Sequence, residues 1–267
     1  MGGFLDGKAA VITGSTSGIG LGYARALAKE GCDVLLNGFG DATEIEAARA
    51  AIEADFEVQA LYHGADMRKP DEIKAMIDTA DKTFGKIDIL INNAGMQHRA
   101  PVEEFPLDVW NDMFAVNVTS AMLTTQMVLP QMKRRNWGRI INTASVNAQI
   151  TSPNTSGYTA SKHAIMGLTR AVALETIMTG VTCNAICPGT VRTNLSEHRI
   201  DAFAAERGNS KEDVIDEYLE QKMPYHQAFK RFITVEEIAA AAVYLCSDAG
   251  DAMRGAAFTI DGGWTIR

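Results

Sequence analysis

The sequence predicts an α/β fold in which helices cover both faces of one doubly wound parallel sheet. Short runs of β-branched and apolar residues alternate along the chain with longer amphipathic runs. A glycine-rich turn stands between the first short run and the first amphipathic run. The run from Ile87 to Asn92 is nearly all apolar, as expected of a parallel strand that is buried on both faces. These three observations favour a parallel sheet.

Helix and strand boundaries in the amino-terminal half follow from glycine and proline. Gly31 ends the first helix, and Pro70 opens the third helix at its first turn, where the missing N–H does no harm. The expected strands cover residues 8–13, 33–37, 58–62 and 87–92, and the helices between them cover 19–30, 42–54 and 70–84.

In the carboxyl-terminal half, long amphipathic runs predict helices over 103–134, 157–179 and 235–246. The expected strands cover 138–145, 181–187 and 257–261. Residues 190–232 form a polar, irregular stretch, and an excursion of that length inside a domain is typical of a substrate-covering lid. Because the chain shows no repeat or linker, we expect one domain over residues 1–267.

Composition excludes several classes of protein. The net charge of −8 argues against nucleic acid or an anionic membrane as the main partner. No apolar run reaches the length of a membrane span, and the amino terminus lacks a signal-peptide pattern, so we expect a cytoplasmic protein. The histidines are scattered and the cysteines form no C-x-x-C pair, so we expect no metal site.

The glycine-rich turn predicts a dinucleotide site. Gly14, Gly18 and Gly20 follow the first expected strand and open the first helix, with the spacing G-x-x-x-G-x-G. Glycines permit the tight turn and let backbone N–H groups approach a pyrophosphate at the helix N-terminus, where the helix dipole favours anions. The position between a strand and a helix makes the motif more specific than a glycine pattern alone.

The residues after the second strand favour NAD over NADP. A ribose 2′-phosphate needs nearby cations, but no Arg or Lys follows Asn37 until Arg49, and Ser17 is not basic. Asp41 and the glutamates after it would repel a phosphate. Gly38 stands where an acid is commonly expected, which leaves the contact to the adenosine ribose open.

Tyr158 and Lys162 stand one helical turn apart, so their side chains share one face of a helix. Taken alone, this spacing fits an ordinary amphipathic pair as well as a proton donor beside a cation. With the glycine turn, Asn92-Asn93-Ala94-Gly95, Asn117, Ser145, Pro188-Gly189 with Thr193 and the closing Asp261-Gly262-Gly263, the whole chain resembles the short-chain dehydrogenase/reductase family. That resemblance implies a Rossmann-type sheet, a nicotinamide cofactor and a homotetramer.

The resemblance implies four catalytic residues. Tyr158 is expected to be the general acid/base, and Lys162 and the oxidised nicotinamide are expected to favour its phenolate. Ser145 is expected to bind the substrate oxygen, and Asn117 to hold a water that connects Lys162 to solvent. Ser145 is alternatively a turn residue, and Asn117 a hydrogen-bonding residue at a helix kink.

The resemblance also implies a set of cofactor contacts. Lys162 would hold the nicotinamide ribose, and Thr193 the carboxamide. Asp66 and Met67 would bracket the adenine, or else form a plain turn. The expected cofactor-binding residues are Gly14, Thr16, Ser17, Gly18, Ile19, Gly20, Phe39, Asp66, Met67, Asn93, Ala94, Gly95, Tyr158, Lys162, Pro188, Gly189, Val191 and Thr193.

Within the family, the chain is most similar to the D-3-hydroxybutyrate dehydrogenase branch, through stretches such as "NNAGMQHRAPVEEFP". Gln97 matches a carboxylate-binding glutamine of that branch, but Asn147 stands in place of its His and Thr155 in place of its Lys. Thr190 stands where an aromatic residue is common. Arg99, Arg192 and Arg199 are candidates for a replacement cation, and Trp264 either closes the pocket or packs at a subunit interface.

The sequence therefore predicts an NAD-dependent oxidoreductase that interconverts a secondary alcohol and a ketone, with a 3-hydroxy acid as the first candidate substrate. The expected substrate contacts are Gln97, Asn147, Thr155 and Thr190. The smaller polar residues favour the alternative of a polyol, sugar derivative or other bulky alcohol. A dinucleotide-binding regulator without turnover is the alternative outside enzymes.

Overall fold

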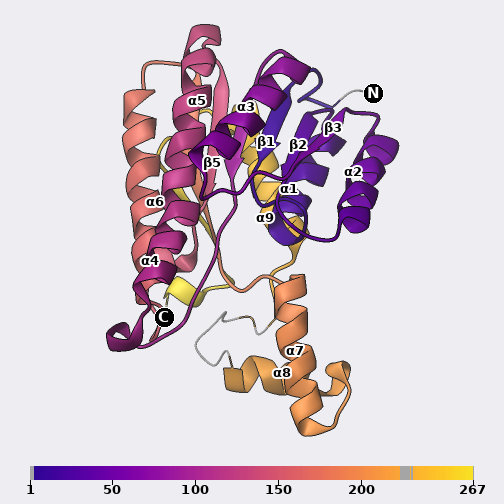
Figure 1. Cartoon of the computed structure of the whole chain (residues 1–267), viewed down its shortest axis with the longest axis vertical. Coiled ribbons are helices and arrows are strands. Elements are labelled where there is room, and N and C mark those ends of the chain that lie inside the picture. The colour runs from indigo at the N-terminus through magenta and orange to yellow at the C-terminus, as the bar shows by residue number, and fades with distance from the viewer. Residues whose placement is uncertain (1–2, 223–228, 230, 267) are drawn as a thin grey trace.

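The computed structural model of this 267-residue chain describes residues 3–222, 229 and 231–266. Its centre is a seven-stranded sheet with the strand order β3-β2-β1-β4-β5-β6-β7, and each neighbouring pair is parallel (Figure 1). The strands are β1 (Ala9–Ile12), β2 (Asp33–Asn37), β3 (Ala60–His63), β4 (Ile89–Asn92), β5 (Gly138–Thr143), β6 (Val181–Pro188) and β7 (Ala257–Ile260). The predicted α/β fold is confirmed.

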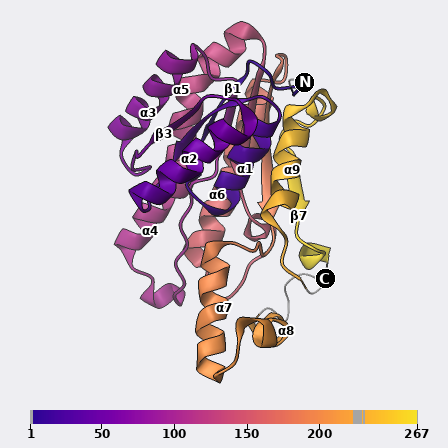
Figure 2. The same cartoon turned by 90° about the vertical axis from the view of Figure 1, so that its right-hand side faces the viewer.

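Helices cover both faces of this sheet (Figure 2). One face carries α1, α2 and α9, which share a core cluster with the strands, and the other carries α3, α5 and α6 with a second cluster. The helices are α1 (Gly18–Lys29), α2 (Ala42–Phe56), α3 (Pro70–Phe84), α4 (Leu107–Phe114), α5 (Ser120–Arg135), α6 (Ser156–Glu175), α7 (Asn194–Arg207), α8 (Lys211–Lys222) and α9 (Val235–Cys246).

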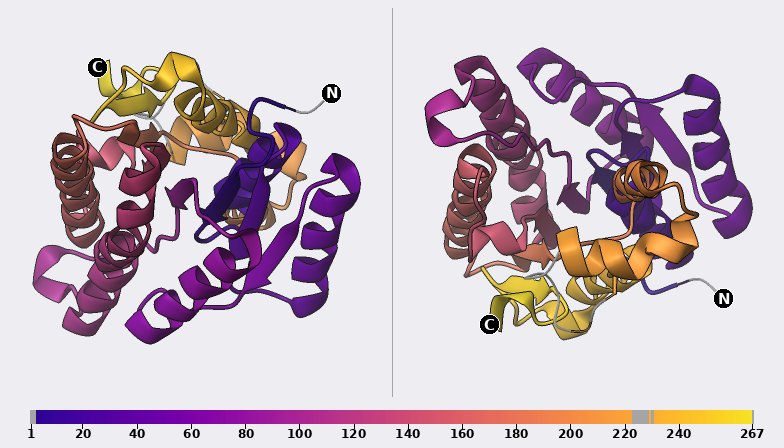
Figure 3. Two further views of the ribbon diagram at one scale, coloured as in Figure 1. Left: turned by 90° about the horizontal axis from the view of Figure 1, so that it is seen from above. Right: turned by 90° about the horizontal axis from the view of Figure 1, so that it is seen from below.

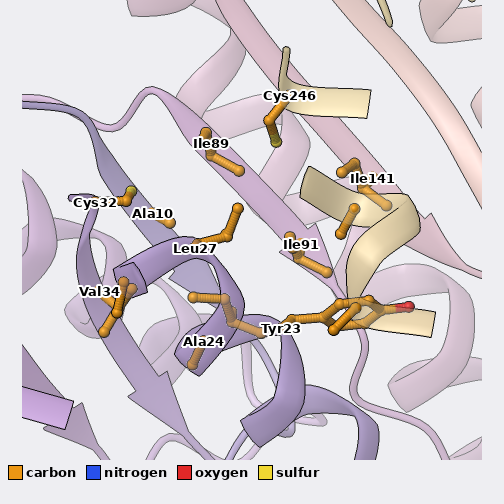
Figure 4. Close-up of a cluster of buried hydrophobic side chains, with 14 of the residues drawn as sticks. Ala10, Tyr23, Ala24, Leu27, Cys32, Val34, Ile89, Ile91, Ile141 and Cys246 are labelled. Atoms are coloured by element: carbon orange, nitrogen blue, oxygen red, sulfur yellow. The ribbon is translucent and has the colours of Figure 1, made fainter. Parts of the chain in front are cut away.

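The layer between α1 and the sheet is tightly closed. Tyr23 and Leu27 of α1 lie against Ile89 and Ile91 of β4, with Cys246 of α9 beside them, and all five are buried (Figure 4). Burial of side chains of this size contributes about 1.5–3 kcal/mol each. This packing fixes the start of α1, and therefore the glycine turn, relative to the ends of the central strands.

The prediction that residues 190–232 are irregular is wrong for 194–207 and 211–222, which are helical, and its residues 223–228 and 230 lie outside the described residues. The segment forms α7 and α8, which project away from the carboxyl ends of the strands, so that α7 is seen end-on from below with α8 beside it (Figure 3). Thr193 and Ser196 form a capping box that starts α7. A small cluster that includes Phe203, Tyr218 and Phe232 then holds the two helices together.

The long helix expected over 103–134 is broken. A 3₁₀ turn at Val102–Glu104 precedes α4, because Pro106 keeps Phe105 extended. A π-helical turn at Ala115–Thr119 then separates α4 from α5. Such wide turns are frequent at functional sites. Smaller differences affect β3, which begins two residues later than predicted, and α6, which ends four residues earlier.

Two negative observations concern the described residues only. No helix among them is both long and apolar enough to cross a membrane. In the same part of the chain, no group of three or more His, Cys, Asp or Glu residues is arranged to hold a metal ion.

Candidate active site

A cavity of about 820 Å³ opens at the carboxyl ends of β4, β5 and β6 and extends up to α7 and α8. Ligand sites of open parallel sheets form at this edge. The cavity is lined by residues of the expected catalytic, cofactor and substrate sets together with aromatic side chains: Ile19, Asn93, Gly95, Gln97, Ser145, Asn147, Tyr158, Lys162, Pro188, Gly189, Thr190, Val191, Thr193, Phe203, Tyr218, Phe232 and Trp264.

Ser145, Tyr158 and Lys162 meet on one wall of this cavity. Ser145 lies just past β5, and its side chain is hydrogen-bonded to that of Tyr158 on α6. The Lys162 Nζ donates to the carbonyl oxygen of Thr143 at 2.8 Å and lies 5.5 Å from the centroid of the Tyr158 ring. The end of β5 and one face of α6 therefore bring these three polar groups into one small volume.

Burial dominates the titration of these groups. It lowers the pKa of Lys162 to about 8 from an ordinary value of 10.5. It raises the pKa of Tyr158, and the hydrogen bond with Ser145 acts in the opposite direction. Tyr158 is therefore a protonated phenol at neutral pH, and Lys162 releases its proton at a lower pH than an exposed lysine does.

Asn117 lies in the π-helical turn and is buried. Its side-chain oxygen accepts from the Met96 N–H at 2.8 Å, and its side-chain nitrogen donates to the Met96 carbonyl and to the Ser161 hydroxyl, both at 3.0 Å. Asn117 thus connects the loop after β4 to α6 one residue before Lys162. A Cβ at Gly95 would lie 3.5 Å from Asn117 Oδ1 and 3.7 Å from Lys162 Nζ, so glycine keeps the space between them open.

The glycine turn forms a cradle that only small residues allow. Gly14 has a φ of +61°, and a Cβ there would lie 2.7 Å from the Cα of Ala94. The Asn93 side chain donates to the carbonyls of Thr13 and Gly14, while the Thr13 hydroxyl accepts from the N–H groups of Asn93 and Ala94. The cradle stands at the N-terminus of α1, so these residues fit a dinucleotide pyrophosphate.

Gly20→Ala tests this cradle. The added Cβ would lie 2.2 Å from the Gly14 carbonyl oxygen and 2.5 Å from Asn93 Nδ2, so the turn must shift. We expect the affinity for reduced dinucleotide, measured by fluorescence titration, to fall by about tenfold or more, since several N–H contacts to the anion are displaced. Gly167→Ala is the control, because a Cβ there meets nothing within 4 Å. Unchanged affinity in Gly20→Ala would contradict this interpretation of the turn.

At the end of β2, Phe39 is 65% exposed and Thr16 Oγ1 donates to its carbonyl oxygen at 3.0 Å. Gly38 has a φ of +147°, and a Cβ there would lie 2.7 Å from Thr16 Oγ1. A larger acidic residue at this position would therefore strain the turn, which explains the departure from the commonly expected acid. Arg49 is unavailable to a ligand, because it pairs with Glu46 and Glu53, each at 2.6 Å.

Asp66 and Met67 follow β3, and Met67 is buried. The Asp66 carboxylate accepts hydrogen bonds from the side chain of Arg68, which hold its pKa below its usual range, and Arg68 also pairs with Asp112 on α4 at 2.9 Å. The Asp66 carboxylate is therefore already hydrogen-bonded to a side chain of the protein itself.

Only three of the four expected substrate residues line the cavity. Gln97, Asn147 and Thr190 line the cavity, but Thr155 does not. Thr155 precedes α6, is buried, and donates to the Ser152 carbonyl at 2.6 Å. Of the candidate cations, Arg99 lines the cavity, whereas Arg192 is paired with Glu197 at 2.5 Å. The side chain of Arg199 lies outside the described structure.

Sequence reasoning missed two contributions to the site. Asn37 ends β2, accepts from the Gly14 N–H at 3.2 Å and donates to the carbonyls of His63 and Ala65, so it ties the glycine turn to β3. A polar residue at the end of an apolar strand was the available signal. The second contribution is a part of the cavity wall formed by Phe203 and Glu206 of α7 and Tyr218 of α8. Because this segment was expected to be irregular, its individual cavity-lining residues could not be predicted.

Comparison with known proteins identifies the chain. The sequence profile described as "short chain dehydrogenase" matches residues 8–202. The chain belongs to the short-chain dehydrogenase family. D-beta-hydroxybutyrate dehydrogenase of Cupriavidus necator is 48% identical over 98% of this chain and 100% of its own length. The protein of the same name from Rhizobium meliloti is 46% identical over 97% of this chain and 99% of its own.

Among solved structures, L-sorbose reductase of Gluconobacter frateurii, complexed with NADPH and L-sorbose, superposes with a TM-score of 0.92. It is 29% identical, and the match covers 98% of both chains. The protein is accordingly a short-chain dehydrogenase, an oxidoreductase that interconverts a secondary alcohol and a ketone with a nicotinamide dinucleotide.

Proposed function

We propose that the protein is an NAD-dependent dehydrogenase that oxidises a 3-hydroxy acid to the corresponding keto acid. The observation that carries this proposal is the Tyr158 hydroxyl, which is hydrogen-bonded to Ser145 beside the buried ammonium of Lys162 at the cavity wall. A dinucleotide-binding regulator would need no such proton donor, so this arrangement favours an enzyme.

In the proposed oxidation, the Tyr158 oxygen accepts the hydroxyl proton of the substrate, and the Ser145 hydroxyl donates a hydrogen bond to the substrate oxygen. Tyr158 must therefore act as phenolate, although burial raises its pKa. The Lys162 ammonium on the same helix face favours the phenolate. When bound, the nicotinamide supplies the hydride acceptor. Asn117 and Lys162 flank the open space at Gly95, which suits the proposed water between Lys162 and solvent.

The charges near β2 support NAD as the cofactor. The Asp41 carboxylate caps α2 by accepting from the N–H groups of Thr43 and Glu44, so it stays beside the proposed ribose site. Arg49 is held by two glutamates, and Ser17 at the start of α1 is exposed and uncharged. A 2′-phosphate would meet negative charge there without a compensating cation.

The relatives that are nearly half identical along the whole chain support a small 3-hydroxy acid as substrate. The alternative is a sugar derivative or polyol. Asn147 and Thr190 at the cavity, with Thr155 outside it, favour this alternative, as does the structural similarity to a sorbose reductase. In either case, α7 and α8 act as the lid that covers the substrate in the cavity.

We also propose that the enzyme works as a homotetramer in the cytoplasm. Leu174 near the end of α6, and Ile177 and Met178 just after it, are exposed apolar side chains, and Met178 is 93% exposed. Exposed apolar patches mark contacts with other protein surfaces. All four cysteines are buried and free, as expected in a reducing compartment.

The proposed function is tested by absorbance assays with hydroxy acids, polyols and both dinucleotides. We expect oxidation of 3-hydroxybutanoate with NAD and a lower kcat/KM with NADP. Ser17→Arg should raise kcat/KM with NADP by about tenfold, because a charged hydrogen bond to phosphate contributes about 1.5–3 kcal/mol. Ser17→Gln is the uncharged control. A wild-type enzyme that uses only NADP, or that oxidises polyols but no hydroxy acid, would overturn the proposal.

A further inference from the structure

Two oppositely charged side chains line the cavity without a partner. Arg99 stands on the loop after β4, and Glu206 stands on α7. Neither forms a hydrogen bond or ion pair with any residue that the structure describes. Nearby charges do pair: Arg192 binds Glu197 and Arg207 binds Glu217, at 2.5 and 2.8 Å. Arg99 and Glu206 are exposed, so their charged groups are open both to the cavity and to solvent.

Neutral hydrogen-bonding groups accompany both charges. The Gln97 amide, on the same loop as Arg99, has no hydrogen-bond partner among the described residues. The Asn147 nitrogen donates to Thr159 at 3.3 Å, but no described group donates to its side-chain oxygen. The cavity therefore offers donors at Arg99 and Gln97, and acceptors at Asn147 and Glu206.

A ligand that matches this pattern needs an anion and additional hydrogen-bond donors. An acid that ends in a methyl group would use Arg99 and make no hydrogen bond to the Glu206 carboxylate, whereas a ligand with a further donor would add one hydrogen bond to a charged group. The cavity of about 820 Å³ must also hold the nicotinamide end of the dinucleotide, because the expected cofactor residues Ile19, Pro188 and Val191 line it. The pattern of donors and acceptors, rather than the volume, favours a substrate that continues beyond the reacting alcohol.

We propose that the natural substrate is a hydroxy acid that carries a further hydrogen-bond donor beyond the reacting carbon, with its carboxylate on Arg99 and its donor on Glu206. This inference rests on the proposed oxidation of a hydroxy acid and narrows its substrate class. The donor is a hydroxyl, as in a sugar acid, or an ammonium. Both bind a carboxylate acceptor, and the experiment separates them.

Four compounds with one carbon skeleton provide the test. They are 1,3-butanediol, 3-hydroxybutanoate, 3,4-dihydroxybutanoate and 4-amino-3-hydroxybutanoate, each assayed with saturating NAD. We expect kcat/KM for one of the two compounds with the extra donor to exceed that for 3-hydroxybutanoate by about tenfold or more, the size of one hydrogen bond to a charged group. The compound with the higher kcat/KM shows whether the donor in the natural substrate is a hydroxyl or an ammonium.

Two variants assign the contacts. Glu206→Gln should remove most of the tenfold preference, measured as the ratio of kcat/KM for the compound with the extra donor to kcat/KM for 3-hydroxybutanoate. Arg99→Gln should lower kcat/KM for all three acids by about tenfold but not for 1,3-butanediol, and Arg99→Lys should restore part of the loss. Glu212→Gln on α8 and Arg134→Gln at the end of α5 are controls, because both residues are exposed and neither lines the cavity.

The outcomes separate this inference from the function on which it rests. If 3-hydroxybutanoate is oxidised at least as well as the two compounds with the extra donor, the inference is wrong and the proposed function stands. A preference that persists in Glu206→Gln overturns the assignment of Glu206. If no acid is oxidised but a neutral alcohol is, the proposed function itself fails.

Discussion

Tyr158→Phe should lower turnover by about a thousandfold or more while leaving dinucleotide binding intact. The substitution removes only the hydroxyl, and general acid–base groups contribute about 10²–10⁴-fold to rate. The ring and its position on α6 stay, so the cavity keeps its shape. The hydrogen bond between this hydroxyl and the Ser145 side chain is lost. Steady-state rates and fluorescence titration with NADH measure the two quantities separately.

Tyr244→Phe is the matched control for this substitution. The Tyr244 hydroxyl on α9 donates to the Ala249 carbonyl at 3.2 Å, and the side chain is 40% exposed and does not line the cavity. That variant should retain wild-type turnover. A Tyr158→Phe enzyme with near-wild-type rates would mean that another group moves the proton, and the proposed role of Tyr158 would have to be abandoned.

The sheet was predictable because its strands carry their own signal. Parallel strands buried on both faces appear as short apolar runs, and the strand from Gly138 to Thr143 is buried at every position. The glycine turn was predictable for a different reason. Gly14 has a positive φ, and its Cα and that of Ala94 approach too closely for a Cβ, so few other residues fit there.

The failures share a physical cause, which is that their determinants are tertiary. α7 and α8 are polar helices whose order depends on a small cluster around Phe203 and Tyr218, so their periodicity is weak in sequence. Thr155 was expected at the substrate because it stands where the resembling branch has a Lys, but its hydroxyl donates to the Ser152 carbonyl. The unpaired charge of Glu206 became visible only when α7 placed it at the cavity.

Lys162→Met should nearly abolish turnover and yet raise the melting temperature at pH 7. Lys162 is only 4% exposed, and its pKa is about 8 in the folded protein against an ordinary 10.5. Below pH 8 the lysine is charged in both states, so burial of the charge costs about 3 kcal/mol. The lost hydrogen bond to the Thr143 carbonyl offsets about 1–2 kcal/mol of the gain from removing that charge.

The sign of the pH dependence follows from the same values. Between pH 8 and 10.5 the unfolded chain holds a proton that the folded protein has released, so wild-type stability rises with pH across this window. The Met variant lacks this contribution, and its advantage should shrink as pH approaches 10.5. Thermal melts at pH 7 and pH 10 measure the difference, with exposed Lys133→Met as the control.

Turnover should respond in the opposite direction to stability. Removing the ammonium leaves Tyr158 in a buried site that already raises its pKa, so less phenolate forms and the rate should fall by about a hundredfold or more. If Lys162→Met lowers both the melting temperature at pH 7 and the activity, the charge of Lys162 stabilises the folded protein, and the prediction is wrong. Gain of stability with loss of turnover would instead show a charge that is kept in the core for its chemistry, at a cost to folding.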